Sequence, residues 1–110
     1  MRPQRREQLI QAYDLILQKR ELAESTSRTY RWQVGAFIDF CGEEPKYVST
    51  SKIEGYLVGL LHRKVSRPFF LQACAAIDLL YRQLYNSNKV RNILPAVQDK
   101  KRTDSRPLSI

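Results

Sequence analysis

Histidine and cysteine are scarce in this sequence, and their scarcity excludes several kinds of metal and catalytic site. The chain has one histidine, His62, and two cysteines, Cys41 and Cys74, without a Cys-x-x-Cys pair. A structural zinc site uses about four Cys or His ligands, so we expect no metal and no cofactor. His62 has no serine or cysteine motif around it, which predicts a surface histidine instead of a triad member. We interpret the two cysteines as reduced core residues.

Long apolar runs and paired acids are also missing. No stretch of about 18 apolar residues occurs, so we expect no membrane partner. The basic N-terminus leads into an amphipathic stretch, unlike a secretory signal, and a cytoplasmic, nucleoid-associated protein is expected. The acids Asp14, Asp39, Glu54 and Asp78 are scattered along the chain and suggest no general acid–base pair. The chain itself is therefore predicted not to be an enzyme.

Positive charge is what the sequence has in excess. Its 110 residues contain 19 Lys and Arg against 11 Asp and Glu, a net charge of +8. The isoelectric point of about 9.8 exceeds the rough threshold of about 9 for nucleic-acid-binding domains. Basic surfaces also aid solubility or bind anionic lipid. In a small helical chain the excess favours a nucleic-acid partner, and we expect double-stranded DNA.

Apolar residues recur at helical spacing along most of the chain, and no strand or hairpin pattern interrupts them. This periodicity predicts an all-α fold, a compact bundle of four to five helices. The expected helices span about residues 5–20, 25–41, 49–61, 68–85 and 90–97. Pro95 is expected to kink or end the last of them.

Three polar or small residues mark the expected helix ends. Ser25 is the predicted N-cap of the second helix, and Gly42 is expected to end that helix. Ser49 is the predicted start of the third helix. Ser51 is a competing start, because Glu54 would complete a capping box with it.

The character of the sequence changes at Gln98. Residues 1–97 are predicted to form one helical DNA-binding domain, whereas residues 98–110 are polar and charged, as in a basic linker. The last three residues, Leu108-Ser109-Ile110, look like the beginning of another element. We therefore expect the N-terminal domain of a longer protein, with an ordinary frayed tail as the alternative.

The second predicted helix carries its charges in the unfavourable order. Arg28 and Arg31 lie near its start, and Asp39, Glu43 and Glu44 lie near its end. Helix N-termini favour acids and C-termini favour bases, so the reversed order costs roughly 0.3–1 kcal/mol per residue. We interpret it as a sign that a phosphate backbone is held near the start of this helix.

Two basic clusters define the predicted DNA-binding surface. The first accompanies the start of the second helix, and the second leads into the fourth helix. If the two helix starts lie side by side, they would present cations and free backbone N–H groups to phosphate. The clusters are Thr26, Arg28, Thr29 and Arg31, and Arg63, Lys64 and Arg67.

A helical protein–protein interaction module is the alternative function. In it, Trp32, Phe69 and the stretch from Val90 to Val97 would bind another protein, and the basic charge would be incidental. Salt dependence separates the two, because DNA binding through several phosphates weakens steeply with salt.

In their order and spacing, the sequence motifs of this chain resemble those of the core-binding (SAM-like) N-terminal domain of tyrosine site-specific recombinases, the phage-type integrases. Residues 22–31 and 37–40 are similar to its first half, 53–57 and 76–84 to its second half, and 106–110 to the seam before the catalytic domain. The resemblance covers about residues 8–110. It implies a SAM-like domain that closes one side of a clamp on duplex DNA and supports recombination or integration.

The resemblance also implies roles for individual residues. Thr26, Arg28 and Thr29 on the second helix, and Gln72 on the fourth, match positions that meet the major groove, where Gln pairs with adenine. The last helix would touch a neighbouring protomer. Catalysis would belong to a separate C-terminal domain of the parent chain. Arg31, Lys64, Arg67 and Arg82 are predicted backbone contacts from charge and location.

The fourth helix departs from the family pattern. Many members carry two basic residues where this chain has Gln72-Ala73, and small polar residues where it has Pro68-Phe69-Phe70. Phe69 is expected to meet a partner or a thymine methyl, or to cover the core. None of the tyrosines is assigned the family's nucleophile role, and Tyr30, Tyr56 and Tyr81 are predicted core residues.

Overall fold

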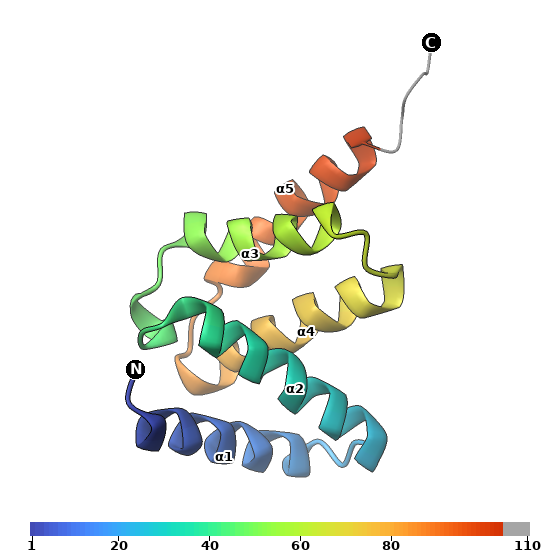
Figure 1. Cartoon of the computed structure of the whole chain (residues 1–110). Helices are drawn as coiled ribbons and strands as arrows, with labels where there is room; N and C mark the ends of the chain where they lie inside the picture. Colours follow the sequence, from blue (N-terminus) through green and yellow to red (C-terminus); the bar gives the residue numbers. More distant parts are fainter. Residues whose placement is uncertain (105–110) are drawn as a thin grey trace.

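Five α-helices and one short 3-10 helix make up residues 1–104, the part of the chain whose backbone the computed structural model describes; side chains are described for residues 1–98. No β-strand occurs in this part, so the predicted all-α fold is confirmed (Figure 1). The elements are α1 (Pro3–Lys19), α2 (Glu24–Cys41), η1 (Pro45–Tyr47), α3 (Thr50–His62), α4 (Arg67–Leu84) and α5 (Lys89–Asp104).

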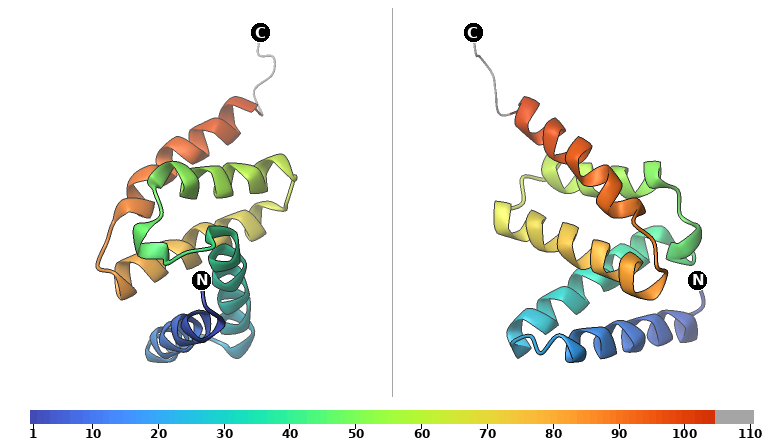
Figure 2. Two further views of the ribbon diagram at one scale, coloured as in Figure 1. Left: turned by 60° about the vertical axis from the view of Figure 1, so that its left-hand side comes forward. Right: turned by 180° about the vertical axis from the view of Figure 1, so that it is seen from behind.

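Helices α2 and α4 form the central pair of the bundle. α1 packs along α2, while α3 and α5 lie on the other side of α4, as the views of Figures 1 and 2 agree. The middle of α2 meets the first turn of α4, because Gln33 Nε2 donates a hydrogen bond to the Phe69 carbonyl at 3.3 Å. Both helices begin at the same end of the molecule, on the right of Figure 1.

Aromatic side chains dominate the core between these helices. Phe37 of α2 meets Tyr56 of α3 and Tyr81 of α4 edge-on, with ring centroids 5.2 and 6.2 Å apart. The Tyr81 hydroxyl donates to the Pro45 carbonyl at 2.6 Å, so this buried polar group is satisfied. Tyr56 and Tyr81 are buried and Tyr30 is partly buried, which confirms the prediction that these tyrosines belong to the core stripes.

The predicted helix ends are partly right. Ser49 caps α3, with its Oγ accepting a hydrogen bond from the Lys52 N–H at 3.1 Å, so Ser51 is not the start. Gly42 ends α2 with φ +69°, in the left-handed region that glycine adopts without strain. The predicted N-cap at Ser25 is wrong. α2 begins at Glu24, and Ala23 occupies the cap position without a side-chain hydrogen bond.

Helix α5 is longer than the apolar pattern predicts. It continues past Pro95 to Asp104, whereas the pattern predicted an end near residue 97. The added residues are polar and offer no apolar periodicity, although lysine and arginine are good helix formers. The expected basic linker, residues 98–110, therefore overlaps the end of α5, and residues 105–110 lie outside the described part.

Both cysteines are buried and unpaired, which confirms their interpretation as core residues. Burial raises the pKa of the Cys41 thiol to about 11 and that of Cys74 to about 12. Within the described residues, no three His, Cys, Asp or Glu side chains gather as metal ligands would. No helix in that part combines the length and the apolar character needed to cross a membrane.

Candidate nucleic-acid interface

The reversed charge order of α2 has a cause inside the molecule. α1 runs antiparallel to α2, so bases near the start of α1 meet acids near the end of α2. Arg6 Nε lies 2.7 Å from Asp39 Oδ1. Farther along, Arg31 Nη1 lies 2.7 Å from Asp14 Oδ1. Interhelical ion pairs therefore account for Arg31 and Asp39 in this pattern. Arg28 has no such pair among the described side chains, so phosphate near the start of α2 stays a prediction.

Glu44 continues this row of pairs just beyond the end of α2. Arg5 donates two hydrogen bonds to its carboxylate, at 2.9 and 2.8 Å, and the Tyr85 hydroxyl donates a third at 2.8 Å. These bonds, foremost those from Arg5, lower the pKa of Glu44. The acidic end of α2 is thus tied to both α1 and the end of α4.

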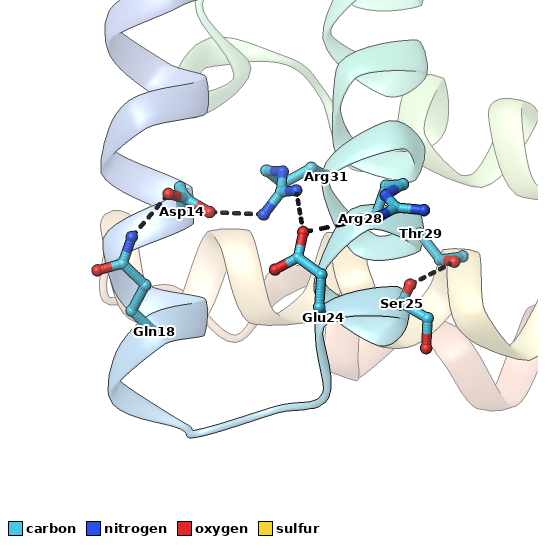
Figure 3. Close-up of polar contacts among 7 residues, drawn as sticks. All are labelled: Asp14, Gln18, Glu24, Ser25, Arg28, Thr29 and Arg31. Carbon is cyan, nitrogen blue, oxygen red and sulfur yellow. Dashed lines mark hydrogen bonds and ion pairs between the residues drawn. The ribbon is translucent and has the colours of Figure 1, made fainter.

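Arg31, a predicted phosphate contact, is held between α1 and α2 (Figure 3). Its guanidinium donates to Asp14 at 2.7 Å and to Glu24 at 3.4 Å, and its side chain is only 28% exposed. Glu24 precedes the expected start of the second helix at about residue 25, but it belongs to the first turn of α2. A carboxylate in the first turn of a helix interacts favourably with the helix dipole. The Glu24 carboxylate also pairs with Arg31.

Two more predicted site residues are engaged within the domain. The Thr29 hydroxyl donates to the Ser25 carbonyl at 3.0 Å, so its hydrogen is already used (Figure 3). Arg82 lies near the end of α4, away from the helix starts, where its Nε donates to Asp78 at 3.0 Å. Thr29 therefore has no hydroxyl hydrogen left for a phosphate, and Arg82 is paired with an acid away from the helix starts.

Arg28 differs from its neighbour Arg31. Its side chain is 72% exposed, and the nearest carboxylate oxygen, on Glu24, is 3.9 Å away. Figure 3 shows Arg31 reaching toward α1 and Arg28 lying on the other side of Glu24. Thr26, on the first turn of α2, is partly buried.

The two helix starts differ in the backbone donors that they present. The first turn of α2 has no side-chain cap, so its leading N–H groups are open to an outside acceptor. In α4, the Ser66 Oγ accepts from the Phe69 N–H at 3.2 Å, and Pro68 has no N–H. α4 therefore offers fewer free donors than we expected.

The segment between α3 and α4 supplies three further cations. Arg63, Lys64 and Arg67 are exposed, and no ion pair in the described side chains involves them. Residues 55–77 contain no Asp or Glu, a signal that was present in the sequence and was not used. Gln72, the predicted base contact, is partly buried on the second turn of α4.

Two exposed aromatic residues form the feature that charge patterns do not reveal. Trp32 is 60% exposed and Phe40 is 46% exposed, both on α2. Val90 and Val97, the two ends of the stretch expected to serve the interaction module or a neighbouring protomer, are fully buried, whereas Arg91, Asn92, Pro95 and Ala96 between them are exposed. Of the other expected residues of that surface, Trp32 is exposed and Phe69 is partly buried.

The fold and the basic end of the bundle together define a SAM-like DNA-binding domain. The model of the family described as phage integrase, N-terminal SAM-like domain, matches residues 9–88. The chain belongs to this family, whose members bind DNA, and the resemblance stated from the sequence is confirmed. No curated protein and no solved structure matches the chain significantly. No catalytic domain is evident in the 110 residues.

Proposed function

We propose that this chain is the DNA-binding N-terminal arm of a tyrosine recombinase or integrase, and that it holds double-stranded DNA where α2 and α4 begin. The position of Arg28, Lys64 and Arg67 carries the proposal. All three are exposed at this end of the bundle, and of the three only Arg28 has an ion-pair partner among the described side chains, at 3.9 Å. Cations without a close acid attract phosphate with little internal competition.

Each contact has its own role in the proposal. Arg28, Lys64 and Arg67 bind phosphates, and the uncapped start of α2 adds backbone donors beside Thr26. Gln72 is the one candidate for reading a base. Most of the affinity is electrostatic and independent of sequence. Arg31 and Arg82 are left out because each is paired with a carboxylate inside the domain, and Thr29 is left out because its hydroxyl donates to the Ser25 carbonyl.

The other proposed partners follow from the family. The catalytic domain lies elsewhere in the parent chain, and the two domains close around the duplex in the cytoplasm, at the nucleoid. The N-terminal domain alone binds weakly, because it lacks the contribution of the tethered catalytic domain. A neighbouring protomer is a further partner. Since Val90 and Val97 are buried, exposed residues of α5 such as Arg91 would make that contact.

Fluorescence anisotropy on a generic duplex of about 25–30 base pairs tests the proposal, because each phosphate contact adds about 0.9 to the log–log salt slope. Lys64→Ala and Arg67→Ala should each reduce the slope by about 0.9. Lys46→Ala is the matched control, an exposed cation on η1 at the opposite end of the molecule (Figure 1).

Two outcomes would overturn the proposal. Absence of duplex binding by the wild-type domain at low salt would put the protein-interaction module in its place. An equal loss of slope in Lys46→Ala would mean that net charge, and not this end of the bundle, attracts the DNA.

A further inference from the structure

A hollow lined by aromatic rings lies beside the basic end of the bundle. On α2, Trp32, Ala36 and Phe40 recur at intervals of four and therefore share one helix face. Ala36, the small member, stands between the two exposed aromatic residues, which leaves room for a ring between them. The resulting hollow has a volume of about 470 Å³ and takes its other sides from α3 and from the first turn of α4.

The rings around the hollow are held in place by their own contacts. Trp32 meets Phe69 edge-on with centroids 5.8 Å apart, and Phe40 meets Tyr56 with centroids 5.0 Å apart. Trp32 nevertheless keeps 60% of its surface exposed, and Phe40 keeps 46%. These rings therefore keep apolar surface available for stacking.

Positive charge flanks the hollow on two sides. Arg63 lines it directly, at the end of α3. On its other side, Trp32 also lines a second hollow of about 500 Å³, together with Arg6, Arg28 and Arg31. The one acid shared by both hollows, Asp39, is paired with Arg6 at 2.7 Å. An aromatic slot between cations matches a nucleotide, which carries a flat base next to a phosphate.

We propose that this hollow binds an unpaired base of a DNA strand, stacked between Trp32 and Phe40, with Arg28 and Arg63 holding the adjacent phosphates. An unpaired base is required because the faces of a paired base are covered by its neighbours in the duplex. Base–aromatic stacking tolerates any base, so the site has little sequence preference. The charge complementarity with Arg28 and Arg63 favours a nucleic acid over an apolar protein segment. This activity is additional to duplex binding at the helix starts.

Trp32 is the only tryptophan, so its fluorescence reports on the hollow itself. A single strand of about 15 thymidines, within the reach of one single-strand-binding domain, should quench that fluorescence in a saturable way. Ala36→Leu fills the hollow with a good helix former and leaves every ring and cation in place. It should weaken single-strand binding by roughly 5- to 150-fold, the loss expected for one stacked base. Trp32→Ala removes the fluorophore, so its binding is measured by the anisotropy of a labelled strand. Its affinity for the single strand should fall by a similar factor.

Tyr47→Ala is the matched control, because Tyr47 is 73% exposed on η1 and does not line the hollow. It should bind the single strand as the wild type does. Circular dichroism establishes that each variant is folded. The duplex, measured in parallel, should bind to Ala36→Leu with unchanged affinity.

The outcomes separate this inference from the proposed function. Duplex binding without single-strand binding would overturn the base-stacking site alone. Single-strand binding that Ala36→Leu and Trp32→Ala leave unchanged would also overturn it and would assign the hollow to another occupant, such as a protein segment. Loss of duplex and single-strand binding at low salt in the wild type would overturn both proposals.

Discussion

Replacing Arg28 or Arg31 by alanine should separate a DNA-contacting arginine from a structural one. Arg31 is 28% exposed and bonds Asp14 at 2.7 Å and Glu24 at 3.4 Å. A partly exposed pair of this kind contributes up to about 1 kcal/mol. Arg31→Ala should therefore lower the free energy of unfolding by about 1 kcal/mol, which corresponds to a fall in Tm of roughly 4–8 °C for a small domain.

Arg28→Ala should show the opposite behaviour. Its side chain is 72% exposed and 3.9 Å from the nearest carboxylate oxygen, so stability should stay within about 0.5 kcal/mol of the wild type. The slope of the log binding constant against log salt should fall by about 0.9, because one phosphate contact is lost. Arg31→Ala, assayed well below its Tm, should keep the wild-type slope.

Thermal unfolding by circular dichroism and duplex anisotropy on the same preparations would measure both effects. Asp14→Ala is a matched control that should cost about as much stability as Arg31→Ala. The double variant should cost little more than either, because both substitutions remove the same interaction. A salt slope that falls equally in Arg28→Ala and Arg31→Ala, with Tm unchanged in both, would refute the reasoning.

Three further predictions concern the fold. Gly42→Ala should cost about 1–2 kcal/mol in thermal unfolding, because φ +69° is unfavourable for alanine although no atom lies within 4 Å of the added Cβ; an unchanged Tm would contradict this. Arg5 lowers the pKa of Glu44, so their pairing should stabilise the fold above the unfolded pKa of about 4.3 and be lost as pH falls through the lower folded pKa. In urea unfolding, the advantage of the wild type over Glu44→Gln should therefore shrink on acidification, and a constant difference would exclude the pairing. Because burial raises the pKa of Cys41 to about 11 and of Cys74 to about 12, a thiol reagent should react slowly with the native protein and quickly with the urea-unfolded one; rapid native reaction would show that the thiols are accessible.

The helices could be predicted because their signals are local. Apolar spacing placed the four N-terminal helices, and Ser49 and Gly42 marked an N-cap and a C-terminus by their own chemistry. The extent of α5 could not be predicted in this way. Pro95 and the polar residues after it are ordinary stop signals, and no apolar side chain reveals that the helix continues to Asp104.

The candidate site was less predictable, because charge alone does not tell which cations are free. Arg28 and Arg31 are three positions apart and chemically identical, yet only Arg31 faces Asp14 across the α1–α2 contact. That difference depends on the packing of two helices and not on the local sequence. The aromatic hollow also draws its residues from three helices and the loop before α4, so no single stretch of sequence displays it.

The distribution of acids explains why several cations between α3 and α4 have no ion-pair partner among the described side chains. Asp14, Asp39 and Glu44 each pair with an arginine across the α1–α2 contact or beside it, and Asp78 pairs with Arg82. Those pairs compensate arginines of α1, α2 and α4. The stretch from 55 to 77 has no acid to do the same. Under the proposed function, phosphate would meet the unpaired cations where α3 ends and α4 begins, and Arg63 there also lines the hollow with the exposed rings of α2.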